Sequence, residues 1–334
     1  MRYKIFYLSV ALLFSGALIA QPKFTEISTK PGAFSRIGFG ARGIGMGNAM
    51  SAVTTGNLVS YYNPALSPFQ ENNSFQTGYS ILSLDRSLNF LSFTRKFDFY
   101  SSKNGSDEGK PSRTAGISVG IINSGVSGID GRDNNGLPTG ELSTSENQFF
   151  LSVANRFSEK FSMGISVKFY YYKLYEEITS NALGLDIGAI YKVNNNWNVS
   201  LMISDINSKY EWDTSPIYGQ QGLATKDEFP IMKKVGVSYF NPEIKLLTAL
   251  EFENSNAGTN IVRLGAEYNI FENLFLRGGI DQLNLSNTDS GLKPSLGFSY
   301  SKVFGDWIVG VDYAFMVEQY SSSDRHIIGV NLQF

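Results

Sequence analysis

Strict alternation of apolar and polar side chains over long segments dominates this sequence from about residue 74 to its last residue. Over residues 161–170, Phe, Met, Ile, Val and Phe occupy the odd positions, and Ser, Gly, Ser, Lys and Tyr the even ones. The same period recurs in residues 183–193 and 307–315. Successive side chains of a strand point to opposite faces, so a period of two predicts β-strands. These strands run to about 10–13 residues, a length that suits a bilayer crossing better than a soluble sheet.

The alternation predicts fourteen strands, and an even number is typical of single-chain bacterial barrels. They are expected near residues 74–84, 87–97, 113–123, 147–157, 161–173, 181–193, 197–206, 230–240, 246–253, 260–270, 274–281, 292–302, 307–317 and 325–334. Short connections at 158–160, 194–196, 241–245, 271–273 and 303–306 alternate with longer polar ones at 124–146, 174–180, 207–229, 254–259, 282–291 and 318–324. That pattern is expected when one end of a barrel carries turns and the other carries loops. We therefore predict an all-β fold, a 14-stranded antiparallel transmembrane β-barrel.

The first hairpin departs from this pattern of connections. Residues 98–112 are long and polar where a short turn is expected, whereas the connection near Arg86 is short where a loop is expected. Either the first hairpin is atypical or the assignment of the first two strands is wrong.

The polar face of the predicted strands is small and charged, which suits a barrel interior, while the apolar face suits contact with lipid. Charges of the two signs are nearly balanced on that face, so we expect them to pair with one another and with Arg36 and Arg42. Contact with a substrate is the alternative role. The charged positions on this face include Arg156, Lys168, Asp186, Lys234, Glu251, Arg263, Glu267, Arg277 and Asp312.

The two ends of the chain carry signals of export. Arg2 and Lys4 precede an apolar run over residues 5–18, which predicts a signal peptide at residues 1–20; a buried N-terminal helix is the alternative. No later stretch approaches the ~20 apolar residues of a spanning helix, which leaves a soluble exported protein or a barrel. The last predicted strand alternates and ends on Phe334, as expected of a strand that the outer-membrane barrel assembly machinery reads. We therefore expect the bacterial outer membrane, with lipids as partners; a net charge of -2 gives no support for nucleic-acid binding.

Residues 21–72 do not alternate and are rich in Gly, Ala and Ser. We expect this segment to lie inside the lumen as a plug, called the hatch below, ahead of a barrel formed by residues 73–334. Short helices are plausible around residues 43–50 and 56–62. The stretch GFGARGIGMGNAM at residues 38–50 matches G-x-G-x-x-G, yet the strand, helix and acidic partner of a dinucleotide site are missing. Its glycines are better explained by close approach to the barrel wall.

Two motifs of the hatch carry a family resemblance: GARGIGMGNA, beginning at Gly40, and YYNPAL, beginning at Tyr61. Together they resemble the N-terminal hatch of the FadL-like outer-membrane transporters, and more closely that of the PorV/PorQ family proteins. Thr54, Thr55 and Asn57 stand where the family pattern has an acidic middle. The resemblance implies a hatch whose motif residues line the transport path. Those residues are Arg42, Gly43, Gly45, Gly47, Asn63, Pro64 and Ala65. For Asn63, Pro64 and Ala65, a plain turn is the alternative.

The resemblance leaves two functions open. In FadL-like fatty-acid transporters, hydrophobic substrates enter through a lateral opening in the wall and pass the hatch by conformational change. PorV/PorQ proteins instead serve type IX secretion, handling exported proteins. The partners expected here are accordingly hydrophobic small molecules or secretion-system proteins. A transporter predicts an apolar pocket between hatch and wall, with a wall opening beside it.

Catalysis finds little support in the sequence. The chain has one histidine, His326, which the alternation places on the lipid-facing side of the last strand. A hydrolytic triad needs a base within hydrogen-bond reach of an oriented serine, and nothing in the pattern points there. With no cysteine and no visible cluster of metal ligands, we expect neither an enzyme nor a cofactor or metal site.

Overall fold

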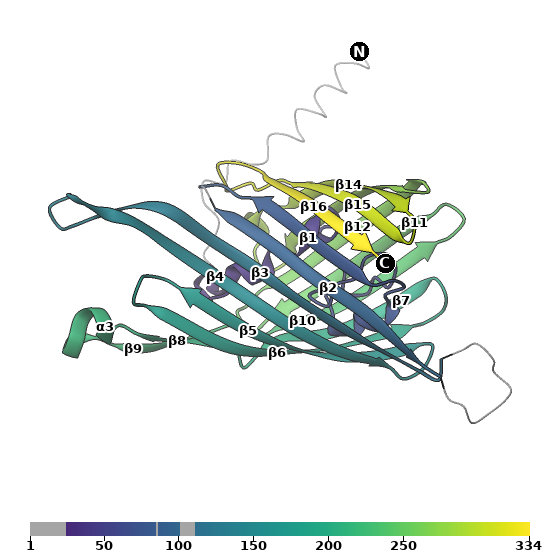
Figure 1. The fold of residues 1–334 in the computed structure, drawn as a ribbon, viewed down its shortest axis with the longest axis horizontal. Helices are drawn as coiled ribbons and strands as arrows, with labels where there is room; N and C mark the ends of the chain where they lie inside the picture. The colour runs from purple at the N-terminus through teal and green to yellow at the C-terminus, as the bar shows by residue number, and fades with distance from the viewer. Residues whose placement is uncertain (1–24, 85, 101–110) are drawn as a thin grey trace, which may run out of the picture.

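Fourteen antiparallel strands close into a barrel in the computed structural model, which describes residues 25–84, 86–100 and 111–334 (Figure 1). Each strand pairs with its neighbour in the barrel order, and β1 pairs with β16 to close the wall. The wall strands are β1 (Ser74–Ile81), β2 (Ser87–Phe99), β3 (Arg113–Arg132), β4 (Pro138–Arg156), β5 (Phe161–Lys173), β6 (Thr179–Lys192), β7 (Trp197–Ile206), β10 (Met232–Asn241), β11 (Leu246–Ser255), β12 (Asn260–Phe271), β13 (Leu274–Asn284), β14 (Lys293–Phe304), β15 (Trp307–Met316) and β16 (Arg325–Gln333).

These strands confirm the predicted barrel and its strand number. Side chains also face as the alternation predicts: on β5, Met163 and Ile165 point outward and are exposed, whereas Ser162 and Ser166 are buried. The first hairpin forms in the predicted place, since β1 pairs in register with β2 over its whole length. Residues 101–110 of the unusual 98–112 connection, and the predicted signal peptide, lie outside the described residues.

The loop predicted at residues 124–146 is wrong, because β3 and β4 continue through it as a hairpin that projects well beyond the other strands (Figure 1). Its turn is held by Asp133, whose Oδ1 accepts the backbone N–H groups of Asn135 at 2.8 Å and Leu137 at 2.9 Å. Past the end of the barrel wall both faces of a hairpin meet water. The apolar–polar alternation that reveals a membrane strand is therefore not required there.

The predicted loop at residues 207–229 also contains regular structure. The strands β8 (Lys209–Asp213) and β9 (Ala224–Glu228) form a separate two-stranded sheet. Between them lie the helical turns α3 (Ser215–Tyr218) and η4 (Gly219–Gln221). A further turn, η5 (Thr288–Ser290), lies between β13 and β14.

The hatch fills the lumen. From residue 25 on, where the structure describes it, the hatch contains three short 3₁₀ turns, η1 (Glu26–Thr29), η2 (Ala33–Arg36) and η3 (Pro64–Phe69), and one α-helical segment, α2 (Gly40–Gly45). The helix α2 packs near β13–β16 and β1, whereas η3 packs near β2–β6, so the hatch reaches across the lumen between opposite walls. Its apolar residues Phe39, Ile44, Met46, Leu58 and Leu66 are almost completely buried.

The helices expected in the hatch are only partly present. The first begins at Gly40 and ends at Gly45, before the predicted end at residue 50. The second prediction, at residues 56–62, is wrong, because that stretch forms bends and turns, and the helical turn begins at Pro64 instead. Asn63 caps this turn by accepting the Ala65 N–H at 2.9 Å, and Pro64 suits its first position. The domain boundaries at residues 20 and 72 remain predictions.

Among the described residues, no helix combines the length and apolarity that a membrane crossing requires.

Candidate functional site

Arg42 ties the hatch to the barrel wall. Its Nε and Nη2 atoms donate to the two carboxylate oxygens of Glu267 on β12 at 2.9 and 2.8 Å, a bidentate pair. Its Nη1 atom donates to the carbonyl oxygens of Thr55 at 2.8 Å and Asn57 at 3.0 Å. Burial alone would lower the pKa of Arg42, but the Glu267 carboxylate raises it above its ordinary value. One charged side chain thus joins α2, the following hatch loop and the wall.

The wall extends this contact into a buried network. Arg277 on β13 donates from Nε to Glu267 Oε2 at 2.6 Å and lies 3.6 Å from Asp312 Oδ1 on β15. Ser299 bridges Arg277 and Asp312, and Asn331 on β16 donates to Asp312 Oδ2 at 2.6 Å. Every member is buried, so loss of one partner would leave another charge without compensation.

A second network surrounds Arg263 on β12. Its guanidinium contacts Glu251 at 3.2 Å, Glu253 at 3.0 Å and Asp281 at 2.7 Å. Lys234 on β10 contacts Glu253 at 3.2 Å and Glu251 at 3.7 Å.

The hatch also bonds to this second network, through neutral donors. Asn48 Nδ2 donates to Asp281 Oδ2 at 2.9 Å, and the Ser51 N–H donates to Glu251 Oε2 at 3.2 Å. Two of the three carboxylates around Arg263, Glu251 and Asp281, therefore have donors from both the wall and the hatch.

Lys168 on β5 forms a third group of charges, at 2.8 Å from Asp186 and 3.1 Å from Asp205. Pairing of lumen charges was predicted, and these ion pairs confirm it for eight of the nine named wall positions. Arg156 differs, because its guanidinium lies 5.6 Å from the Phe69 ring of the hatch, a cation–π contact. Arg36 also differs: its Nη1 donates to the Pro31 carbonyl at 2.6 Å, and no carboxylate among the described residues forms an ion pair with it.

The glycines of the hatch motif make close approaches at two positions in particular. A Cβ atom at Gly43 would overlap the hydroxyl of Tyr62, which accepts the Phe39 N–H at 2.9 Å. Gly47 has a φ of +58° and would place a Cβ only 2.6 Å from backbone atoms of Ile280 and Leu264. Gly45 is less confined, since its nearest neighbour would be the Gly297 Cα at 3.4 Å.

The Asn63-Pro64-Ala65 box packs against the opposite wall. Asn63 is fully buried, and its Nδ2 donates to the carbonyl oxygens of Ser51 at 3.2 Å and Ala189 at 3.4 Å. A Cβ atom at Gly188 on β6 would overlap the side chain of Asn63. The predicted place of this box on a transport path stays a prediction.

An aromatic cluster was not predicted from the sequence. Tyr170 lies 4.7 Å from Phe229, ring centroid to centroid, and Tyr210 lies 5.0 Å from Phe229 and 5.5 Å from Trp212. Tyr170 and Tyr210 are completely buried. The sequence signal that could have revealed this cluster is the run of three tyrosines at residues 170–172, where the alternation of β5 stops.

The wall also has a seam between β6 and its neighbours. The β6–β7 pairing shifts register between Leu185 and Ile187 and has no paired residue of β6 before Leu185. There β8 lies beside β6, where the Ser180 hydroxyl accepts the Glu211 N–H at 2.9 Å and donates to the Glu211 carbonyl at 2.8 Å. A surface cavity of about 370 Å³ opens at this seam; its lining includes Phe169, Ala182, Leu183, Asn207 and Lys209.

Hatch side chains, among them Phe39, Ile44 and Met46, are buried inside the lumen. Two cavities lie among its charges, one of about 100 Å³ beside Arg42 and one of about 20 Å³ beside Lys168, and both are lined largely by polar residues. His326 sits on the outward face of β16, where its Nδ1 lies 2.7 Å from the Tyr313 hydroxyl. Among the described residues, no three His, Cys, Asp or Glu side chains are grouped so as to hold a metal ion.

Comparison with known proteins places the fold. No family model matches the chain, and no curated protein matches it. The solved toluene transporter TodX of Pseudomonas putida is similar, with a TM-score of 0.57 and 14% identity over 88% of this chain and 96% of that one. The toluene transporter TbuX of Ralstonia pickettii gives 0.57 and 14% over 89% and 98%, and a Pseudomonas aeruginosa FadL homologue gives 0.51 and 11% over 89% and 98%. The chain therefore has the 14-stranded FadL-like barrel fold.

Proposed function

We propose that the chain is a FadL-like outer-membrane protein that moves hydrophobic small molecules across the outer membrane through a hatch-gated lumen. The observation that carries this proposal is a barrel lumen occupied by a plug that polar contacts join to the wall, above all Arg42 with Glu267. TodX and TbuX, whose fold the chain shares, are toluene transporters. Outer-membrane lipids would contact the apolar outward face, and the assembly machinery would read β16 and Phe334.

The seam beside β6 offers the entry point. Its cavity is lined in part by Phe169, Ala182 and Leu183. No residue of β6 before Leu185 is paired with β7, so a molecule could enter there without breaking a backbone hydrogen bond between these two strands. Tyr170, next to Phe169 on β5 but facing inward, belongs to the buried aromatic cluster. An apolar molecule that entered there would meet aromatic rings before it met the charged networks. Passage through the lumen then requires the hatch to shift.

A reversible lock on the hatch tests this proposal. Ser51 of the hatch and Ser200 of β7 face each other across the contact between hatch and wall, and their hydroxyl oxygens lie 2.9 Å apart. This proximity suits a disulfide, and the chain has no other cysteine. We expect cells that carry a Ser51→Cys/Ser200→Cys protein in their outer membrane to take up labelled toluene faster when the cysteines are reduced than when they are oxidised.

The two single-cysteine variants serve as matched controls, since they carry the same side chains without the cross-link. Uptake that is equal in the oxidised and reduced double variant, with the disulfide verified by mass spectrometry, would contradict hatch gating. Uptake by cells with the reduced protein that is no faster than uptake by cells without the protein would contradict transport itself.

A second candidate function is that of a PorV/PorQ-type component of type IX protein secretion. Two projecting elements favour it, the β3–β4 hairpin and the β8–β9 sheet (Figure 1). They expose Leu137, Tyr218 and Leu223, each more than 60% accessible. We expect exported or secretion-system proteins to co-purify with the whole chain and to be lost when residues 128–142 are replaced by a short turn. Equal recovery with both proteins, or none with either, would contradict this candidate.

A further inference from the structure

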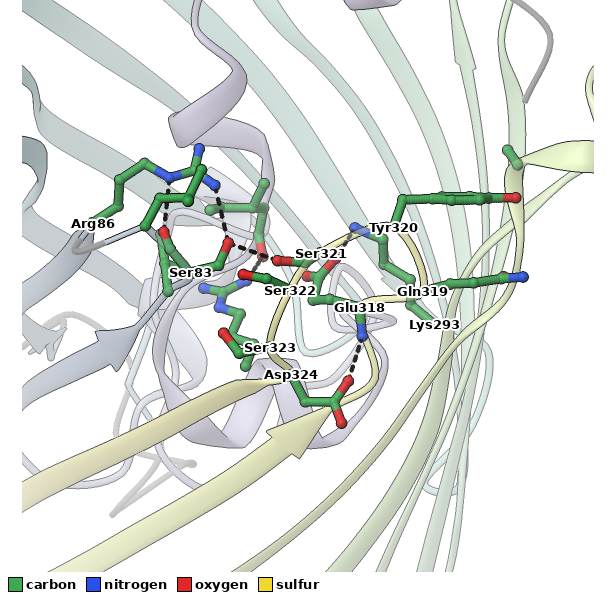
Figure 2. A pocket seen from close by; sticks show the side chains of 15 residues that line it. Ser83, Arg86, Lys293, Glu318, Gln319, Tyr320, Ser321, Ser322, Ser323 and Asp324 are labelled. Carbon is green, nitrogen blue, oxygen red and sulfur yellow. Dashed lines mark hydrogen bonds and ion pairs between the residues drawn. The ribbon is translucent and has the colours of Figure 1, made fainter. Parts of the chain in front are cut away.

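A pocket of about 430 Å³ opens at the barrel end that carries the longer loops. It lies between the β1–β2 connection and the loops that follow β13 and β15, and Ile37 of the hatch contributes to its lining. Figure 2 shows Ser83, Lys293 and the loop residues 318–324 gathered around it. None of the residues that the proposed transport function uses lines this pocket.

Arg325, the first residue of β16, lines the pocket although it is only 1% exposed. Its Nε donates to Ser80 Oγ at 2.8 Å, and its Nη1 donates to the Ile37 carbonyl at 2.7 Å. Its Nη2 is buried and has no hydrogen-bond partner. Within the described part of the chain, no carboxylate forms an ion pair with this guanidinium, in contrast to Arg42, Arg263 and Arg277.

The carboxylates of the pocket are already engaged. Glu318 pairs with Lys293 at 2.6 Å, and Asp324 Oδ1 accepts the Glu318 N–H at 3.0 Å. With Arg86, which donates to the Ser83 carbonyl at 3.2 Å, the described lining holds more cations than anions. Among the described residues neither Arg86 nor Arg325 forms an ion pair, and Arg325 is the buried one of the two. A buried charge is expected to find a counter-charge or a full set of hydrogen bonds.

Hydroxyl groups complete the pocket. Ser83 and Ser290 line it together with residues 321–323, which are all serine, and Ser83 and Ser321 share a hydrogen bond of 2.6 Å that Figure 2 shows. A charged planar donor surrounded by hydroxyl donors matches the needs of an oxyanion, because guanidinium and hydroxyl groups both bond its oxygens.

We propose that this pocket binds an oxyanion group, a carboxylate or a phosphate, with the free Nη2 of Arg325 as its charged anchor. The same guanidinium holds the Ile37 carbonyl, so the bound anion sits on a contact between wall and hatch. The oxyanion comes either from a small soluble anion or from the phosphate of a lipid headgroup, and the two sources differ in the rest of the molecule.

Titration of the purified full-length protein in detergent micelles tests the site. Sodium butyrate, inorganic phosphate and a short-chain phosphatidic acid are added separately, and binding is followed by calorimetry. We expect at least one of them to bind. Binding of butyrate or inorganic phosphate identifies a soluble anion, and binding of phosphatidic acid alone identifies a lipid phosphate.

Three variants assign the site. Arg325→Gln removes the anchor, and we expect affinity to fall at least about tenfold, the size of a lost charge-assisted hydrogen bond. Ser322→Trp fills the pocket from an exposed loop position and leaves Arg325 unchanged. We expect it to weaken binding as strongly as Arg325→Gln does, and it tests the site even if Arg325→Gln fails to fold. Arg86→Gln, the matched control, removes a charge at the same pocket and is expected to weaken binding no more than about threefold.

The proposal is overturned if none of the three probes binds, which would mean that water satisfies Nη2. It is equally overturned if the Ser322→Trp protein binds as well as the parent, or if Arg86→Gln weakens binding as much as Arg325→Gln. Because no transport step is measured, failure here is independent of failure of the proposed function.

Discussion

Replacing Arg42 by methionine should release the hatch from the wall. The change removes two bonds to Glu267 and two to the carbonyl oxygens of Thr55 and Asn57, and it leaves the Glu267 carboxylate buried with Arg277 as its remaining partner. Both side chains of the Arg42–Glu267 pair are only 8% exposed, so solvent screening is weak. Breaking one partner of such a buried pair costs about 3–5 kcal/mol.

That free energy predicts a large change in hatch position. At about 1.4 kcal/mol per factor of ten, an open hatch becomes about a hundred-fold to a few thousand-fold more populated. Single-channel recording in planar bilayers measures this population directly, and we expect frequent openings in the Arg42→Met protein where the parent stays closed. Hydrogen exchange of the backbone amides around residues 40–57 should accelerate in parallel.

An exposed ion pair of the same type provides the matched control. Arg132 and Asp130 contact each other at 2.6 Å with side chains more than half exposed, so Arg132→Met should change neither conductance nor exchange in the hatch. A second change, Glu267→Gln, should partly restore closure in the Arg42→Met background because it removes the uncompensated charge. Conductance of the Arg42→Met protein that matches the Arg132→Met protein would refute the view that Arg42 holds the hatch.

Three further perturbations probe the packing, the titration and the seam. Gly43→Ala should lower the yield of folded barrel on SDS gels, because its Cβ would overlap the Tyr62 hydroxyl, whereas Gly278→Ala, with its nearest neighbour at 3.8 Å, should fold normally; equal yields would contradict the clearance argument. Burial raises the pKa of the Tyr62 phenol well above its ordinary value, so the folded state keeps this proton longer than the unfolded state does. Its contribution to the free energy of unfolding is present below pH ~10 and is lost as the pH rises above it. In denaturant titrations between about pH 9 and 11, the free energy of unfolding should therefore fall less steeply with pH for a Tyr62→Phe protein than for the parent. Ser180→Ala removes two hydrogen bonds to Glu211 and should speed exchange of the Glu211 amide about fivefold, an effect of about 1 kcal/mol; unchanged exchange would show that the seam is held by other contacts.

The wall strands were predictable because an exposed apolar outer face and a crowded polar lumen enforce alternation at nearly every residue. Strands that extend beyond this constraint could not be predicted from the alternation. The outer halves of β3 and β4 meet water on both faces, and residues 124–132 and 138–146 showed no pattern that marks a strand. The same holds for β8 and β9, which are too short to display a period.

The sequence predicted which charged residues of the candidate site face the lumen, but not which residues they contact there. Arg263 and Arg156 both occur on the inward face of a predicted strand, yet one contacts three carboxylates and the other an aromatic ring. The difference depends on how neighbouring strands are staggered and on which hatch residue lies opposite. The local chemistry of Asn63 and Pro64 did mark the start of a turn, because capping and a fixed φ act within a few residues.

The contacts of Arg42 also set an order of events during biogenesis. The hatch precedes the wall in the chain, yet Glu267 lies 225 residues further along the chain from Arg42, and Asp281 lies 233 residues from Asn48. The barrel closes only when β16 pairs with β1, so neither the barrel nor the docked hatch can form until the C-terminal strands are present. Contacts so distant in sequence make folding slow. The hatch therefore spends most of barrel assembly as a charged, glycine-rich segment without its final partners, and its docking is among the last steps that the nascent protein completes.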